Sequence, residues 1–191
     1  MMKYRFWLFF VLFFCSFSGV SQEKEERELK IGLNDFPNSA QTIIRERVFV
    51  KRIKFYKEID GNKLSYEAKF KYRNYQYSLE FSETGTIEDI EIKIKEKELP
   101  ESALANIEDY LDNNFDKFKL RKIQMQYLNS SFTDVINAAF EKIESDKINY
   151  EIIVEYKKDR QIGLLEVTFN SKGQFLKKRD VKRSSYEHVL Y

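Results

Sequence analysis

The chain has 191 residues, of which 42% are hydrophobic, 16% aromatic and 34% charged. This composition is too apolar for a disordered chain, and 6 Gly with 2 Pro are too few for a fibrous one. Lys and Arg number 33 against 31 Asp and Glu, so no charge excess points to nucleic acid or to an anionic membrane. One His and one Cys leave little for metal or nucleophilic chemistry. The length suits one medium domain or two small ones.

The N-terminal residues have the pattern of a cleaved signal peptide. Lys3 and Arg5 precede an apolar run over 6–17, and Gly19-Val20-Ser21 has the small-x-small spacing that signal peptidase reads. Cleavage is therefore expected before Gln22, and the mature chain is expected to be periplasmic or secreted.

Two other interpretations of this segment are weaker. A membrane anchor needs about 20 apolar residues, and the run over 6–20 is shorter. A lipoprotein would carry its acyl chains on Cys15, but bulky Phe13 and Phe14 precede it where small residues are expected. Cleavage would remove two basic residues and the single Cys, which leaves a mature chain of zero formal net charge that cannot form disulfides.

Two stretches of the remaining chain share a pattern at an offset of 63 residues. The stretches 36–44 and 99–107 align Pro, Ser, Ala and Ile. Proline belongs in the first turn of a helix, where its missing N–H has no partner to lose. Each copy is therefore predicted to open with an amphipathic helix. The apolar stripe of the second helix consists of Leu99, Ala103, Ile107, Leu111 and Phe115.

Extended segments follow both helices. At 48–55 and 118–125 the apolar alternation changes phase, which predicts a bulge or bend. At 63–72 and 147–156 the alternation predicts strands with one buried face.

Turn motifs separate the predicted strands. Arg73-Asn74 closes a hairpin in the first copy, and 157–160 closes a looser one in the second. Each copy then carries Phe-x-x-x-Gly, at 81–85 and 169–173, where glycine suits a turn with positive φ. The last strands are predicted over 87–94, with Ile90, Ile92 and Ile94 on one face, and over 175–181.

The second copy contains extra chain over 129–146. The spacing of Ile136, Ala139, Phe140 and Ile143 predicts one face of an inserted helix, and Ser131 or Thr133 could cap it.

These elements predict an α+β fold of two tandem helix-plus-antiparallel-sheet repeats, each with about one helix and four strands, and with an extra helix in the second repeat. Whether the repeats form one continuous sheet or two facing sheets stays open. The expected divisions are a signal peptide over 1–21, repeat 1 over 22–95, repeat 2 over 96–182 and a tail over 183–191.

The order of a Pro-initiated helix, a Tyr-Glu-x-x-Val/Phe strand and a hairpin closed by Phe-x-x-x-Gly resembles the PepSY-like domain, in two copies over 29–181. That family is similar in fold to the β-lactamase inhibitor proteins, which use tandem helix-plus-sheet modules and bind enzymes through the sheet surface. The resemblance implies an exported protein of the kind found in Bacteroidetes-type bacteria.

No catalytic, cofactor-binding or metal-binding residue is predicted. His188 lies four residues from the C-terminus, where a tail residue is expected rather than a triad or metal ligand. Without a thiol or a second His, the common zinc sites are excluded. Acid pairs such as Glu88-Asp89 are expected by chance at this charge density, and no cofactor is expected.

The two faces of the predicted strands have different roles. Four tyrosines of one hairpin share the phase of Phe70, Leu79 and Phe81, so they are expected to pack under the helix rather than to form a recognition surface. These tyrosines are Tyr66, Tyr72, Tyr75 and Tyr77. The opposite face is polar, and it supplies the candidate partner-binding residues Lys69, Lys71, Glu80, Ile153 and Glu155.

The favoured function is therefore that of an exported, non-catalytic binding module. Its partner is expected to be a periplasmic or envelope protein or peptide, with inhibition as one form of that binding, and with neither nucleic acid nor a stable membrane span involved. The alternatives are a hydrolase that uses carboxylates only and a structural envelope protein that associates with itself.

Overall fold

A computed structural model describes residues 23–24 and 26–181. The predicted signal peptide with its cleavage before Gln22, and the predicted tail with His188, lie outside the described residues. Within the described part of the chain, no helix is long and apolar enough to cross a membrane.

The described strands form one continuous sheet in the order β1-β10-β9-β8-β7-β6-β5-β4-β3-β2. Neighbouring strands are antiparallel, apart from the parallel pair of β1 with β10. Of the two arrangements that the sequence left open, the structure therefore has the single continuous sheet. The strands are β1 (Glu23–Lys24), β2 (Glu26–Ile31), β3 (Ile53–Asp60), β4 (Lys63–Tyr72), β5 (Tyr75–Ser82), β6 (Ile87–Ile94), β7 (Lys117–Leu128), β8 (Asn149–Lys158), β9 (Gln161–Asn170) and β10 (Phe175–Val181).

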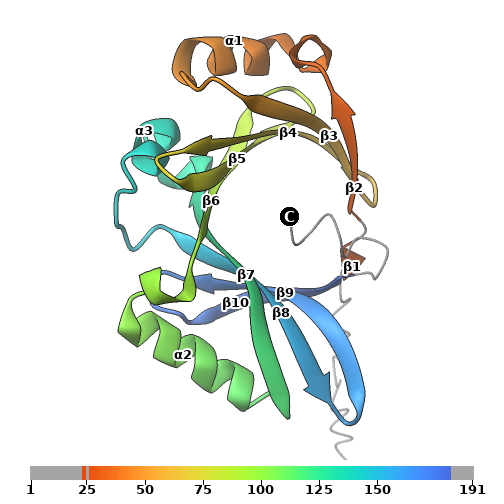
Figure 1. Ribbon diagram of the computed structural model, residues 1–191, viewed down its shortest axis with the longest axis vertical. Helices are drawn as coiled ribbons and strands as arrows, with labels where there is room; N and C mark the ends of the chain where they lie inside the picture. Colours follow the sequence, from red (N-terminus) through yellow and green to blue (C-terminus); the bar gives the residue numbers. More distant parts are fainter. Residues whose placement is uncertain (1–22, 25, 182–191) are drawn as a thin grey trace, which may run out of the picture.

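The helices cover one side of this sheet. Figure 1 shows the sheet curled on itself, with all three α-helices on its convex side. The fold is therefore α+β and dominated by strands, as the sequence predicted at this level. The helices are α1 (Asn38–Arg47), α2 (Glu101–Asp112) and α3 (Val135–Phe140), with short 3₁₀ turns η1 (Leu33–Asp35), η2 (Glu96–Glu98) and η3 (Asn129–Ser131).

Both long helices begin directly after a proline. Pro37 and Pro100 stand one residue before α1 and α2, and their carbonyl oxygens accept hydrogen bonds from the next turn. The apolar stripe predicted for the second helix is confirmed, because Leu99, Ala103, Ile107 and Leu111 are all buried. Leu99 precedes α2 and Phe115 follows it, but both still pack against the core.

The hairpin tyrosines pack on the convex, helix-covered side, as predicted. Tyr77 is 2% exposed, stacks on Phe70 with ring centroids 5.5 Å apart, and donates a 3.5 Å hydrogen bond to the Ala139 carbonyl of α3. Tyr66, Tyr72 and Tyr75 are partly buried against the same core. The alternation along β4 and β5 therefore directs the polar side chains to the concave side of the sheet.

The two predicted phase changes have different structures. In β7 there is a bulge at Arg121, because Leu120 pairs with Val154 while Lys122 pairs with Ile153. Before β3 there is no bulge, since Val48 and the residues up to 52 lie in the connection from α1, with a bend at 51. That phase change marks the entry of the chain into the strand.

The inserted helix is shorter than predicted and has a different cap. Asp134 caps α3 by accepting a 3.0 Å hydrogen bond from the Asn137 amide, and its carboxylate also binds Arg47 at 2.7 Å. Asp134 directly precedes the first helical residue, so it reaches the free amide better than Ser131 or Thr133. The helix ends at Phe140, which leaves Ile143 outside it and 44% exposed.

The two Phe-x-x-x-Gly turns support the helix N-termini. Gly85 and Gly173 have φ of +82° and +77°, as the motif predicted. A Cβ at Gly173 would lie 2.1 Å from the carbonyl oxygen of Ala103 in α2, and one at Gly85 would lie 2.2 Å from Ser39 Oγ in α1. The turns are thus packed directly against the helices.

Replacing Gly173 by Ala is expected to destabilise the protein by about 2–4 kcal/mol, because the new methyl group meets backbone of α2 and the positive φ is strained. Gly61→Ala is the matched control, since Gly61 has φ of +60° but no atom within 4 Å of the added Cβ. It should cost only about 1 kcal/mol in urea unfolding. Equal losses for the two variants would show that α2 does not depend on this contact.

Candidate functional site on the concave side of the sheet

The polar side chains of successive strands line the concave side, which we call the concave face. Each strand directs one set of side chains under the helices, so the intervening set must point the other way. Two cavities lie on this face, at opposite ends of the strands. We call them the acidic cavity and the basic cavity after the side chains that line them.

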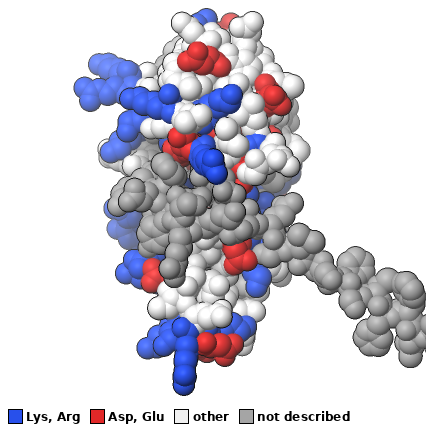
Figure 2. All heavy atoms as spheres, turned by 90° about the vertical axis from the view of Figure 1, so that its right-hand side faces the viewer, with Lys and Arg blue, Asp and Glu red and all other residues white. Residues whose placement is uncertain are grey.

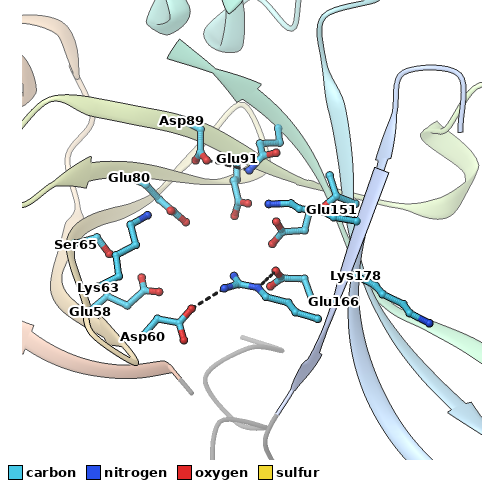
Figure 3. A pocket seen from close by; sticks show the side chains of 14 residues that line it. Glu58, Asp60, Lys63, Ser65, Glu80, Asp89, Glu91, Glu151, Glu166 and Lys178 are labelled. Carbon is cyan, nitrogen blue, oxygen red and sulfur yellow. Dashed lines mark hydrogen bonds and ion pairs between the residues drawn. The ribbon is translucent and has the colours of Figure 1, made fainter. Parts of the chain in front are cut away.

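The acidic cavity has a volume of about 390 Å³. Its walls come from the eight strands β3 to β10, on both halves of the sheet, and seven carboxylates lie among its lining residues. Figure 3 shows these side chains directed into the space between β3, β5, β6 and the last strands. The carboxylates belong to Glu58, Asp60, Glu80, Asp89, Glu91, Glu151 and Glu166.

Three of these carboxylates come close together on β5 and β6. One oxygen from each of Glu80, Asp89 and Glu91 lies within 4.8 Å of the other two. Glu80 and Asp89 are direct cross-strand partners, and Glu80 is also paired with Glu67 on its other side. Like charges directly opposite each other in a sheet are destabilising, so this arrangement opposes folding unless something neutralises it.

Burial is the largest cause of the raised pKa values in this cluster. It raises the pKa of Asp89 from 3.8 to about 6, against the lowering effects of Lys63, Lys177 and a hydrogen bond from Gln126. Burial and the charges of Asp89 and Glu91 raise the pKa of Glu80 well above its usual range.

Hydrogen bonds reach some, but not all, of the carboxylate oxygens of the cluster. Gln126 Nε2 donates to Asp89 Oδ2 at 2.9 Å, and the amide of Gln124 donates to Glu91. Asp89 is 8% exposed, and its second oxygen, Oδ1, is buried without a hydrogen-bond partner among the described residues. A buried carboxylate oxygen without a partner is costly and calls for an explanation.

The basic cavity has a volume of about 760 Å³ and lies toward the opposite ends of the same strands. Lys54 and Lys71 are among its exposed cations. Figure 2 shows a group of Lys and Arg side chains on the upper part of the molecule, seen from the side of β1 and β2. The lining cations are Lys51, Arg52, Lys54, Lys69, Lys71, Lys93 and Lys122.

Lys69 lines the basic cavity and forms ion pairs with two acidic side chains. Its ammonium group lies 2.5 Å from Glu28 of β2 and 2.9 Å from Glu67. Burial by itself lowers the pKa of Lys69, but the two carboxylates outweigh it and the pKa is raised. Farther along the cavity, burial and the charge of Lys122 lower the pKa of Lys93.

Arg179 joins the two ends of the sheet across the concave face. Its guanidinium lies 2.6 Å from Asp60 of β3 and also forms an ion pair with Glu166 of β9, which is 1% exposed (dashed lines in Figure 3). Burial lowers the pKa of Arg179, but Glu166, Glu151 and Asp60 raise it overall. Strands β3 and β10 each stand second from an end of the sheet, so this contact fixes how far the sheet curls.

All five candidate residues predicted from the sequence lie on the concave face, but not at one place. Glu80 lines the acidic cavity, while Lys69 and Lys71 line the basic one. Glu155 forms an ion pair with Arg121. Ile153 is 1% exposed and packs in a small apolar cluster with Leu164 of the neighbouring strand β9 and Val181 of β10.

The sequence interpretation missed the centre of the acidic cavity. Asp89 and Glu91 occupy the strand positions between Ile90, Ile92 and Ile94, so the alternation already assigned them to the polar face. The sequence gives no reason to single out the pair Glu88-Asp89, but in the sheet Asp89 lies directly opposite Glu80. Arg179 had no local signal, because its partner Asp60 is 119 residues away.

No family model matches the chain, and no curated protein matches it. Similar solved structures include a DUF2874 family protein from Bacteroides ovatus, a protein from Bacteroides eggerthii proposed to be periplasmic, and a BLIP-like protein from Bacteroides fragilis. Each is 12% identical to this chain and has a TM-score of 0.49, over 76% of this chain and 87%, 88% and 86% of the respective structures. At this level the similarity says nothing of what the chain binds.

Replacing Arg179 by Met is expected to lower the free energy of unfolding by about 2–4 kcal/mol, because the buried Glu166 carboxylate loses its guanidinium partner. Arg73→Met is the control, since Arg73 lies 3.6 Å from Glu141 and both side chains are more than half exposed. Its effect in the same urea titration should stay below about 0.5 kcal/mol. Comparable losses would mean that the Arg179 contacts do not hold the sheet ends.

Replacing Asp89 by Asn is expected to stabilise the protein at neutral pH. The folded-state pKa of Asp89 is raised, so the folded state holds the proton more tightly and stability falls as pH rises through about 4 to 6. Asn removes this loss and still accepts the hydrogen bond from Gln126. The advantage over wild type should be near zero at pH 4 and about 2 kcal/mol at pH 7 in chelator-treated buffer.

Urea unfolding of both proteins at several pH values gives this difference directly. Because Glu98 and Asp134 have lowered pKa values and act in the opposite direction, the comparison uses the difference between variant and wild type. If the difference in unfolding free energy between Asp89→Asn and wild type does not change with pH, the raised pKa of Asp89 does not contribute to the pH dependence of stability.

Proposed function

We propose that this chain is an exported, non-catalytic binding module that holds a protein or peptide partner on its concave face. The observation that carries the proposal is the division of that face into an acidic cavity and a basic cavity at opposite ends of the strands. Charged groups placed in this way select a partner of complementary charge pattern and fix its orientation.

The partner in this proposal is a polypeptide that presents acidic groups to the basic cavity and basic groups to the acidic one. Lys54 and Lys71 are exposed cations that can bind such acidic groups without first breaking a buried ion pair. Lys69 is less suited to direct binding, because Glu28 and Glu67 already hold its ammonium group. Inhibition of a partner enzyme would be one consequence of such binding.

We also propose that the module consists of two PepSY-like copies. In each half a helix is followed by four strands, and the glycine turn is bonded to that helix. Ser39 Oγ of α1 donates to the Thr84 carbonyl at 2.9 Å, and Asn106 Nδ2 of α2 donates to the Lys172 carbonyl at 2.8 Å. The expected signal peptide places the mature chain in the periplasm or outside the cell.

The two alternatives from the sequence are less well supported. A carboxylate-only hydrolase would use Glu80 and Asp89, whose pKa values are raised, but no group that would align a substrate with them is identified among the described residues. Self-association through the sheet edge is opposed at β2, where Arg27, Glu28 and Lys30 are charged residues of the kind that discourages strand pairing.

A displayed library of linear peptides tests the proposal, with the chain from Gln22 onward as bait. Selected peptides are expected to carry acidic residues, and their affinity should fall at least about tenfold in the double variant Lys54→Glu, Lys71→Glu. Affinity should also fall when NaCl is raised from about 50 mM to about 500 mM. Mass spectrometry should recover the bound peptide intact, because the proposed module does not cleave it.

Lys172→Glu is the matched control. Lys172 is exposed in the turn beside α2, so the same change of charge there should leave peptide affinity unchanged. Failure to select any peptide, or equal losses in the control and the double variant, would rule out binding through the basic cavity. Cleaved peptide would rule out the non-catalytic part.

A further inference from the structure

The carboxylates of Glu80, Asp89 and Glu91 converge at one point of the concave face, and we propose that they bind a hard divalent cation such as Ca²⁺. This site lies on β5 and β6, at the wall of the acidic cavity. The ion would share the acidic cavity with the basic groups of the proposed partner, but the site needs only groups of this chain and a free ion, so it can be tested without the partner.

The spacing of the three carboxylates suits a single ion. One oxygen from each residue lies within 4.8 Å of the other two. Ligand oxygens stand about 2.3–2.6 Å from Ca²⁺, so two ligands of one ion are separated by at most about 5 Å. Figure 3 shows the labelled side chains of Glu80, Asp89 and Glu91 directed toward one another. Water would supply the remaining oxygens, as it often does for Ca²⁺.

A second observation comes from the hydrogen bonds of Asp89. Its side chain is more than nine-tenths buried, and Gln126 holds Oδ2 so that the carboxylate has a fixed orientation. The other oxygen, Oδ1, has no hydrogen-bond partner among the described residues. Asp89 therefore presents a buried, oriented lone oxygen at the cluster, where a cation would give it a partner.

The surrounding charges leave room for such an ion. Lys63 and Lys177 are the cations that lower the pKa of Asp89, and Lys63 has the larger effect, but the ammonium group of Lys63 is bound to Glu88 at 2.6 Å. Gln124 and Gln126 are neutral donors that orient the acids without cancelling their charge. A divalent cation would remove the repulsion between cross-strand neighbours and so stabilise the fold.

Thermal unfolding of the chain from Gln22 onward tests the site. Wild type, Glu80→Gln, Asp89→Asn and Glu83→Gln are compared in chelator, in millimolar CaCl₂ and in NaCl of equal ionic strength. CaCl₂ should raise the Tm of wild type by about 3 °C or more above the NaCl sample. The rise should be absent in Glu80→Gln and Asp89→Asn. Titration calorimetry should give one ion per wild-type chain, with a Kd of about 10⁻⁵ to 10⁻³ M.

Glu83→Gln is the matched control, because Glu83 is exposed in the turn between β5 and β6 and lies outside the cluster. It should keep the full response to CaCl₂. Both cluster variants should be at least as stable as wild type in chelator, which shows that they fold. No response in wild type, or equal responses in all four proteins, would overturn the proposal. Peptide binding as proposed above would be unaffected by that result, so the two proposals can fail separately.

Discussion

Packing of one set of strand side chains beneath the three helices is the interaction on which the rest of the structure depends. Residues such as Leu79, Ile92 and Ile152 are fully buried there, so the intervening residues of β5, β6 and β8 must point to the concave side. Curling of the sheet then brings these polar side chains toward one another. The charged interior of the concave face is therefore a consequence of burying the apolar face.

The charged side chains that converge on the concave face need partners of opposite charge. Ion pairs neutralise some parts of the face more completely than others. Lys69 and Arg179 each hold two carboxylates, which satisfies the parts of the face contributed by the outer strands. The middle of the face differs, because Glu80 and Asp89 are like-charged neighbours on adjacent strands. Departures from a locally favourable sequence are most often found at functional sites, and both proposals for this protein are based on this face.

Local sequence patterns were sufficient for most elements of the fold. The alternation around Ile90, Ile92 and Ile94 predicted β6, and the stripe through Ala103 and Ile107 predicted α2. Predictions failed where a competing local contact decided the structure. Asp134 caps α3 in place of Ser131 or Thr133 because it directly precedes the helix.

The sequence by itself determined most helices and strands from α1 onward and the polarity of their faces, because both follow from residue spacing along the chain, whereas it did not predict β1 and β2. Only the tertiary structure decided that the sheet is continuous, through the pairing of β6 with β7, and that Arg179 reaches Asp60. It also decided that Glu80 meets Asp89 and Glu91, although the polar phase of all three was visible in the sequence. Such neighbours depend on strand register and sheet curvature, which are set by contacts between residues far apart in the chain and have no local period.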